Sequence, residues 1–534
     1  MTQTLGIAAG SVEVVPTTET ALPDLLGRWT KQAVRPCAWL ASAALLVLFL
    51  GYRDLPLIDL PQHVSQISTW IHWNDPMFRG QSMLEVNTRT PYVLVEYLAR
   101  WLTPAIGTLN ALKLLAWIGV VGNMLTVSKL ARKLGHDPAF ALLGLLTALG
   151  YSFYFGFISF VFTTPLVLVC VLAGIAHAEK PDLRRGALLT ALLFALLVAH
   201  GFAFAIAVAT VGLTLTIDRA VHFRREPGRV LRRFAPLLIA VTVAAIWIGR
   251  DHTLHKPIAA TVLDIGLQRV FGLPALILGV GGSPDYLAIA FACGVMLACE
   301  IGLYQRNAKG SVPKARYALL AVSIAGYLLL PLQLPSTGCL HERLVPFLLP
   351  GLMLAIPPVR EQERPRRLAL FRGLCLVLTV GWVAVLGLRL SSLNRETADF
   401  HAMEPLMPPE QRIRPLIFDS APQAFPGNPA FLHFPAYFVA EHGGTVAYSL
   451  AVFPHMVIRY RAGVTPPLEF GREWEPKQFD AARELSSFDY VLVHAGRDPA
   501  SLFAKAPSVV TPDAHVGKWW GYRVTHAATA RAAL

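Results

Sequence analysis

Long apolar runs separated by short polar segments dominate the first 390 residues of the chain. A helix needs about 20 predominantly apolar residues to cross a bilayer. Eleven runs meet or approach this length, and we predict a transmembrane helix at each: residues 36–52, 109–131, 138–154, 158–178, 186–199, 202–218, 234–250, 285–304, 317–334, 344–359 and 370–390. The fifth and sixth runs are short, and they alternatively form a re-entrant pair that meets at His200 and Gly201.

The segments between these runs alternate in charge, and the alternation predicts an orientation. Arg28, Lys31 and Arg35 precede the first run, and every second loop after it is rich in arginine and lysine. Because cytoplasmic loops retain positive charge, residues 1–35 are predicted to be a cytoplasmic leader. The leader has no pattern for signal-peptide cleavage, so the first span is expected to be retained. Eleven crossings would place the chain after residue 390 outside the membrane.

Composition supports a membrane protein. Apolar residues make up 54% of the chain and charged residues only 15%, against about 25% in soluble domains. The net charge of +13 does not indicate nucleic-acid binding, because the basic residues gather in the loops between apolar runs. Most of the six cysteines lie within apolar runs, and no CxxC spacing occurs. The sequence therefore predicts neither a disulfide framework nor a zinc site.

The region 391–534 has a different pattern, with many prolines and roughly balanced charge. Residues 414–420 and 488–496 are short apolar runs typical of buried strands, and residues 435–444 are typical of a helix ended by glycine. We predict a small α/β domain here. The expected fold is a polytopic α-helical membrane protein of about 11 transmembrane helices, in domains 1–35, 36–390 and 391–534.

The outer loop 53–108 opens with an acidic motif at the membrane surface. Asp59 lies between two prolines, and a helix beginning at Leu60 would place Asp59 and His63 on one face. Asp59 would alternatively act as the N-cap of that helix, and Asp54 would alternatively only solvate the end of the first span. The segment 64–73 is predicted to lie on the membrane surface with Trp70 as an anchor.

Further polar residues are predicted to face the same side of the membrane. Ionisable groups at membrane depth are costly unless they are paired or line a water-filled cavity, so they are candidate functional residues. Arginine and lysine at a low-dielectric rim suit a phosphate. The candidates are His200, Arg250, His252, His255, Lys256, His341, Glu342 and Arg343. The alternative to a functional role for residues 250–256 is that they are ordinary basic residues at the end of a span. The alternative for His200 is that it only forms a hydrogen bond to a neighbouring helix.

Four motifs together resemble a known family. Asp54 and Asp59 follow the first span, YSFYFGFISF precedes the fourth, AHG occupies 199–201, and HERLVPFLLP opens the tenth. With an external C-terminal region, this order is similar to the GT-C superfamily of membrane glycosyltransferases. The family often carries an adjacent acidic pair or DxD, whereas LPLI separates the two aspartates here. The resemblance leaves open which aspartate is catalytic.

The resemblance implies transfer of a sugar from a polyprenyl-phosphate carrier to an acceptor at the outer face of a bacterial inner membrane. Asp59 would be the base, Asp54 a second candidate or metal partner, and His63 an orienting group, while Arg343 and the other candidates would hold the phosphate. A divalent cation, the sugar and the acceptor (glycan, lipid or protein) stay open. In the C-terminal region, candidates for shaping an acceptor site are His455, Arg459, Arg461, Trp519 and Trp520. The alternatives are a transporter or flippase, or a non-catalytic scaffold with an external binding domain.

Overall fold

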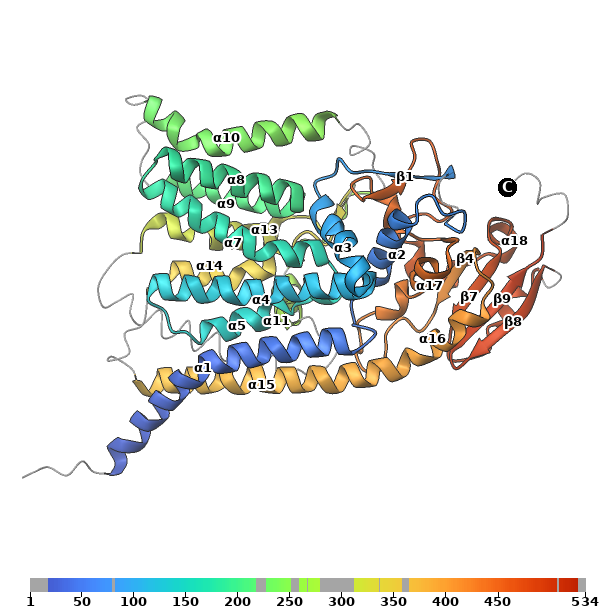
Figure 1. Cartoon of the computed structure of the whole chain (residues 1–534), viewed down its shortest axis with the longest axis horizontal. Coiled ribbons are helices and arrows are strands. Elements are labelled where there is room, and N and C mark those ends of the chain that lie inside the picture. Colours follow the sequence, from blue (N-terminus) through green and yellow to red (C-terminus); the bar gives the residue numbers. More distant parts are fainter. Residues whose placement is uncertain are drawn as a thin grey trace, which may run out of the picture.

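The structure is a computed structural model that describes residues 18–78, 82–217, 227–250, 259–266, 268–278, 312–335, 337–357, 365–506 and 509–526. A helical bundle forms one end of the molecule and an α/β region forms the other (Figure 1). The described N-terminal helix starts at the far end of the bundle, and the C-terminal strands lie at the opposite end.

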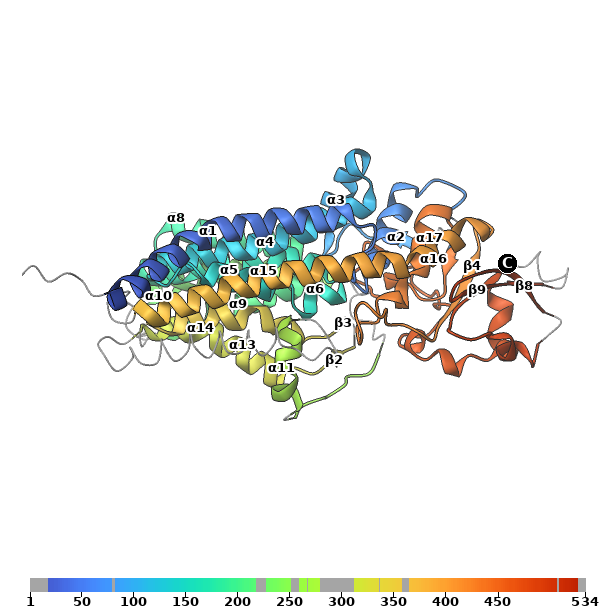
Figure 2. The same cartoon turned by 90° about the horizontal axis from the view of Figure 1, so that it is seen from below.

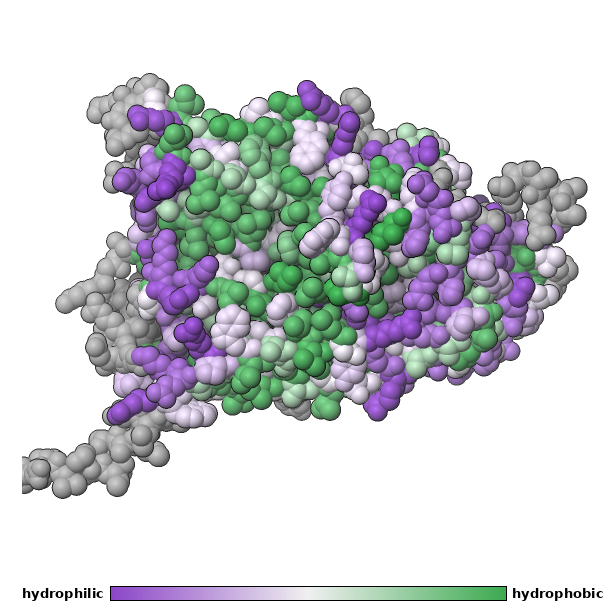
Figure 3. All heavy atoms as spheres, viewed as in Figure 1, coloured by the Kyte–Doolittle hydropathy of each residue, from purple (hydrophilic) through white to green (hydrophobic). Residues whose placement is uncertain are grey.

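Five helices in the described part of the chain are long and apolar enough to cross a membrane. Their spanning segments are Gly27–Gly51, Thr108–Leu134, Ile158–Glu179, Val230–Arg250 and Pro365–Leu406. The helices concerned are α1 (Thr18–Gly51), α4 (Thr108–Leu134), α7 (Ile158–Glu179), α10 (Pro227–Arg250) and α15 (Pro365–Glu396). Apolar residues cover much of the visible surface of the bundle, whereas polar residues gather at its free end and on the α/β region (Figure 3).

Shorter helices complete the bundle. They are α5 (Phe140–Ala148), α6 (Tyr151–Phe155), α8 (Leu183–Ala199), α9 (Gly201–Ile217), α11 (Gln268–Leu278), α13 (Ala318–Leu329), α14 (Leu348–Ala355) and the 3-10 helices η3 (Lys314–Tyr317) and η4 (Glu342–Phe347). The predicted spans at 138–154, 186–199, 202–218, 317–334 and 344–359 fall on these helices. The predicted span 285–304 lies outside the described residues, so the total of eleven stays a prediction.

Small residues set the packing of the bundle. On α4, a side chain added at Gly119 would lie 2.6 Å from the carbonyl oxygen of Val161 on α7. The two backbones therefore approach more closely than any residue with a side chain allows, as is common between membrane helices. Helices α1 and α15 lie side by side in both views and run in the same direction (Figures 1 and 2).

The α/β region is built on a five-stranded sheet with the strand order β5-β4-β7-β9-β8. The strands are β4 (Arg412–Ile417), β5 (Thr445–Val446), β7 (Tyr490–His494), β8 (Val510–Val516) and β9 (Trp519–Val524). Strands β4, β5 and β7 are parallel, and β9 pairs antiparallel with both β7 and β8. Both predicted strands are confirmed as β4 and β7, and the predicted helix is α17 (Pro435–His442), which ends at Gly443.

The remaining helices of this region are short. They are α16 (Ala398–Met403), α18 (Ala481–Glu484) and the 3-10 helices η5 (Glu404–Leu406), η6 (Ala430–His433), η7 (Leu450–Val452), η8 (Arg472–Trp474), η9 (Pro476–Gln478), η10 (Leu485–Ser487) and η11 (Ala500–Phe503).

The outer loop packs into the C-terminal region. It contains α2 (Leu60–Ile71), β1 (Leu84–Val86) and α3 (Val93–Ile106). Strand β1 pairs antiparallel with β6 (Ile458–Tyr460), and α2 packs against α17. Trp70 and Val93 form one apolar cluster with Val457 and Ile458. The outer loop and the C-terminal region therefore form a single folded unit.

The prediction that residues 64–73 lie on the membrane surface is wrong. Eleven of the twelve residues of α2 are buried. Its glutamines Gln62 and Gln66 donate to the carbonyl oxygens of Tyr448 and Ile458, so this polar face contacts the C-terminal region instead of solvent. The exposed aromatic residues of the loop lie on α3, where Trp101 is 77% exposed.

A second two-stranded sheet lies just before η4 in the chain. Strands β2 (Gln333–Leu334) and β3 (Thr337–Gly338) form a hairpin, and Val262 bridges to Gln333. The hairpin immediately precedes η4, which carries Arg343.

Candidate functional site

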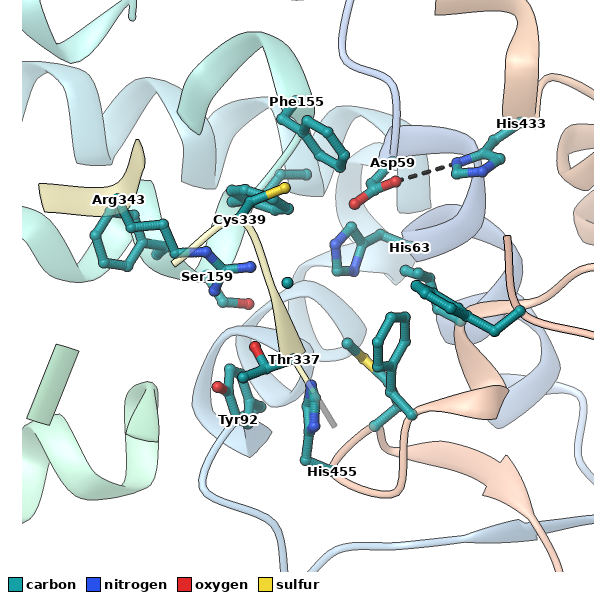
Figure 4. A pocket seen from close by; sticks show the side chains of 18 of the residues that line it. Asp59, His63, Tyr92, Phe155, Ser159, Thr337, Cys339, Arg343, His433 and His455 are labelled. Carbon is teal, nitrogen blue, oxygen red and sulfur yellow. Dashed lines mark ion pairs between the residues drawn. The ribbon is translucent and has the colours of Figure 1, made fainter. Parts of the chain in front are cut away.

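A cavity of about 330 Å³ lies where the bundle, the outer loop and the C-terminal region meet. Each of the three parts contributes polar residues to it. The outer loop provides Asp59, His63, Tyr92 and Glu96; the bundle provides Ser159, His200, Thr337, Cys339 and Arg343; the C-terminal region provides His433, Tyr448, His455, Glu473 and Trp474. Figure 4 shows Asp59 and Arg343 approaching this space from opposite sides.

The aromatic motif YSFYFG holds the backbone of Asp59. Helix α6 ends at Gly156, whose φ is 90°, a conformation that favours glycine. The carbonyl oxygens of Tyr154 and Phe155 accept hydrogen bonds from the N–H groups of Ile58 and Asp59 at 3.1 and 3.0 Å. A side chain at Gly156 would lie 2.8 Å from the Asp59 nitrogen, so the motif and the aspartate fit together only with glycine here.

The Asp59 carboxylate does not cap α2. Asp59 is the N-cap residue, but its side chain makes no capping hydrogen bond. Its Oδ1 instead lies 3.1 Å from Nδ1 of His433, which comes from η6 in the C-terminal region (Figure 4). The His433 ring stacks on Tyr448 at 5.2 Å between centroids. The capping alternative is therefore wrong, and the carboxylate is held at the cavity by a partner distant in sequence.

His63 forms a second carboxylate–histidine pair in the same wall. Its Nδ1 lies 3.3 Å from Oε1 of Glu96 on α3. Burial lowers the pKa of His63, but the hydrogen bond to Glu96 and the charges of Glu96 and Asp59 more than compensate, so the pKa is raised. His63 consequently holds a proton more readily than an exposed histidine does.

Arg343 provides positive charge on the opposite side. It is 8% exposed, and its guanidinium lies 3.9 Å from the ring centroid of Phe157. Among the described residues, none forms an ion pair with Arg343, and its Nε has no hydrogen-bond partner. A buried arginine with an aromatic ring beside it and a cavity ahead of it suits an anion.

Two histidines lie near Arg343. Burial first, and then the charge of Arg343, lower the pKa of His455 to about 3, so His455 is neutral at physiological pH. His200 follows α8, and its Nδ1 accepts from the N–H of Ala203 at 3.3 Å, which caps α9. Tyr92 packs against both rings, at 4.4 Å between centroids in each case. Arg343 is therefore the principal cation at this end of the cavity.

Asp54 does not line the cavity. It is 1% exposed, and its Oδ2 lies 2.8 Å from Nε2 of His401 on α16. Its backbone N–H and carbonyl both bond to the side chain of Asn394 on α15. These contacts make Asp54 part of a joint between the first span and the C-terminal region. The structure thus provides no place for Asp54 as a second base or metal partner at the cavity.

Other predicted site residues also lie elsewhere. His341 and Glu342 form their own pair, with Nδ1 3.2 Å from Oε2, and neither lines the cavity. Arg250 is the last residue of α10 and is not among the lining residues. His252, His255 and Lys256 lie outside the described residues.

In the C-terminal region only His455, among the five predicted residues, lines the cavity. Trp519 is fully buried and stacks on His494, and Trp520 stacks on His515. Arg459 pairs with Glu85 at 2.8 Å, and Arg461 donates to the carbonyl oxygen of Leu84. These two arginines fasten the β1–β6 pairing, which sequence analysis did not predict.

Sequence analysis also missed His433, Glu96 and Glu473. A signal existed for Glu96, because it is the only acidic residue of the apolar segment that forms α3. His433 interrupts the apolar run AFLHFP, which was a weaker signal. In the part of the chain that the structure describes, no group of three or more His, Cys, Asp or Glu residues is arranged to hold a metal ion.

Three chains of solved structures match this chain. The chain is similar to the crystal structure of ArnT from Cupriavidus metallidurans in the apo state, with a TM-score of 0.40 and 15% sequence identity over 92% of this chain and 98% of that chain. Similarity at this level assigns no fold family. No protein-family model and no curated protein matches the chain.

Proposed function

We propose that this protein is a GT-C-type membrane glycosyltransferase. It transfers a sugar from a polyprenyl-phosphate carrier to an acceptor, with Asp59 as the base and Arg343 as the phosphate ligand. The observation that carries the proposal is that Asp59 and Arg343, 284 positions apart in sequence, line one cavity beside the apolar helices. The site lies in a bacterial inner membrane, with the leader in the cytoplasm and the C-terminal region outside.

The two sides of the cavity match the two demands of the reaction. The acceptor hydroxyl must lose a proton, and a carboxylate within hydrogen-bonding reach can accept it. The departing phosphate must be stabilised as negative charge develops on its bridging oxygen, and a positioned guanidinium supplies that stabilisation. Asp59 and Arg343 provide these groups from opposite sides of the cavity (Figure 4).

Histidines hold the base and complete the wall. His433 accompanies the Asp59 carboxylate at 3.1 Å, and His63 lies beside it with Glu96 behind. We assign His433 and His63 as positioning residues, because each contacts or neighbours a carboxylate. The isoprenoid tail lies against the apolar faces of the bundle helices, in contact with the bilayer.

The test is to replace Asp59 by asparagine, which preserves shape and removes the charge. The purified protein is incubated with synthetic polyprenyl-phosphate mannose, glucose, galactose and arabinose together with envelope extract, and release of polyprenyl phosphate is followed by mass spectrometry. We expect the wild type to consume at least one donor, and Asp59→Asn to lose turnover by roughly 100-fold or more.

The matched control is Asp419→Asn. The side chain of Asp419 is 40% exposed and pairs with Lys518, and Asp419 is not among the residues that line the cavity, so turnover of this variant should equal that of the wild type. Equal turnover in Asp59→Asn and wild type, with both proteins folded, would refute the assignment of Asp59. Consumption of none of the four donors would count against the proposed donor class.

A further inference from the structure

One wall of the cavity consists of aromatic residues from the C-terminal region that the proposed function does not use. Phe470 packs edge-to-face on Phe453 at 5.5 Å between centroids, and Tyr448 lies 6.5 Å from Phe470. Trp474 lines the same cavity and yet is 45% exposed. A large indole that is open to solvent at the rim of a cavity is available to a ligand.

A buried carboxyl group lies next to this indole. Glu473 lines the cavity, is 8% exposed, and its Oε2 has no hydrogen-bond partner. Burial is the main cause that raises the pKa of Glu473, and it outweighs the hydrogen bonds to backbone groups and to Trp474. A buried carboxyl oxygen without a partner is costly in a folded protein, and such groups call for a ligand or a function.

Close contacts connect the aromatic wall to Asp59. His433, whose Nδ1 lies 3.1 Å from Oδ1 of Asp59, stacks on Tyr448, and Tyr448 in turn lies 6.5 Å from Phe470. Arg343 approaches the cavity from the side opposite Asp59 and packs on Phe157 (Figure 4). The aromatic wall is therefore joined to the base through His433 and Tyr448.

The connection to Asp59 indicates which substrate the aromatic wall would meet. In a displacement at the anomeric carbon, the acceptor oxygen attacks as the bond to the phosphate oxygen breaks. The leaving phosphate takes the electron pair of that bond at the Arg343 end. The acceptor hydroxyl gives its proton to Asp59, so the body of the acceptor extends from Asp59 toward Glu473 and Trp474.

We propose that Glu473, Trp474 and Phe470 form a saccharide subsite, so that the acceptor of the reaction is a glycan. This inference rests on the proposed function. A sugar ring presents a face of weakly positive C–H groups and a rim of hydroxyls, which match the negative face of an indole and the oxygens of a carboxyl group. A small number of polar groups within an aromatic pocket usually orients such a ligand.

The experiment measures binding of free saccharides, so it does not depend on turnover. Full-length protein in nanodiscs is tested by saturation-transfer NMR with the methyl glycosides of mannose, glucose and galactose, with methyl arabinofuranoside, and with N-acetylglucosamine. We expect at least one to bind the wild type. Trp474→Ala should weaken that binding about tenfold, and Trp474→Phe should weaken it less because the ring face is retained.

Three further variants separate the possible explanations. Glu473→Gln should weaken binding while leaving the aromatic wall in place. Trp101→Ala is the matched control, because Trp101 is even more exposed but lies on α3 outside the cavity lining, and it should bind as the wild type does. Asp59→Asn should keep saccharide binding even where it has lost transfer, so failure of the catalytic proposal does not appear as failure of the subsite.

Two results would overturn the inference. One is that none of the five saccharides binds the wild type. The other is that Trp474→Ala and Glu473→Gln, eluting as folded protein, bind as well as the wild type does.

Discussion

Two aspartates five positions apart, Asp54 and Asp59, have similar surroundings and different consequences. Both are buried, and each pairs with a histidine of the C-terminal region, His401 at 2.8 Å and His433 at 3.1 Å. Only Asp59 lines the cavity, whereas hydrogen bonds from two sides enclose the Asp54 segment. Burial and a histidine partner are thus common to both carboxylates, and only access to the cavity distinguishes Asp59, the proposed base, from Asp54.

The joint around Asp54 and the cavity around Asp59 also differ in how their charged side chains are paired. At the joint, Arg53 lies 3.4 Å from Glu404, and His401 bridges Glu404 and Asp54 at 2.8 Å to each, so opposite charges alternate. At the cavity, Arg343 forms no ion pair with any residue in the described ranges. The joint is arranged for stability. The carboxylates at the cavity are paired with histidines, and Arg343 is the charged group that lacks an ion-pair partner among the described residues.

The largest effect that separates the two regions is expected at Arg343. Arg343→Gln should reduce transfer by about 10²–10³-fold, because the developing phosphate charge loses its main partner. The melting temperature should stay equal or rise, since the variant removes a buried charge without a protein partner. Transfer is followed by donor release, and unfolding by intrinsic fluorescence on heating. Arg523→Gln, at an exposed surface pair, is the control; a lower melting temperature for Arg343→Gln with normal transfer would reverse the assignment.

Gly156→Ala should affect the cavity through the backbone alone. The added methyl would lie 2.8 Å from the Asp59 nitrogen and would also require a φ of 90°. We expect a loss of about 1–3 kcal/mol in stability and about tenfold or more in transfer. Gly373→Ala on α15, where nothing lies within 4 Å of the new methyl, should change neither quantity. If Gly156→Ala behaves like Gly373→Ala, the close fit between the motif and Asp59 is not needed.

Asp54→Asn should give the opposite result to Asp59→Asn. The asparagine can still bond to His401, but the charge pair is lost, so we expect about 2 kcal/mol of destabilisation. Transfer per folded molecule should be close to that of the wild type. Thermal unfolding and transfer measured on the same preparations compare the two variants directly. Normal stability together with lost transfer would indicate instead that Asp54 takes part in the reaction.

The smallest expected effect is the pH dependence of the joint. Hydrogen bonds to Asp54 and Glu404 raise the pKa of His401 from 6.5 to about 9, although burial alone would lower it. The raised pKa means that this stabilisation is complete below pH 6.5 and is lost as the pH rises through about 9. We expect a loss of about 1–2 kcal/mol over that range. His401→Gln should flatten this part of the stability profile, and an unchanged slope would contradict the prediction.

Local pattern predicted much of the architecture. The five long helices lie where apolar runs of sufficient length occur, and β4, β7 and α17 follow their own apolar and glycine signals. The assignment of α2 failed because its amphipathic pattern fits a membrane surface and a protein surface equally well. Its burial is decided by Tyr448 and Ile458, almost 400 positions away.

The candidate site was predictable in part. Asp59, His63, His200 and Arg343, which all line the cavity, were predicted because ionisable residues at membrane depth are costly unless they are paired or line a cavity. Asp54 could not be separated from Asp59, because both occur in the same motif and only the tertiary contacts of Asn394 and His401 distinguish them. His433 and Glu473 lie in the C-terminal region, which carries many other charged residues and histidines, so only the fold distinguishes the two that reach the cavity.

Pairing of β1 with β6 has a consequence for biogenesis. Leu84 meets Tyr460 across a separation that includes most of the membrane-spanning chain, so the outer loop waits for its partner until nearly the whole protein has been synthesised. During that interval Trp70 of α2 lacks its apolar cover from Val457 and Ile458, so the growing chain exposes this surface until the C-terminal region follows. A ribosome stalled after α15 would leave an inserted bundle with half a cavity.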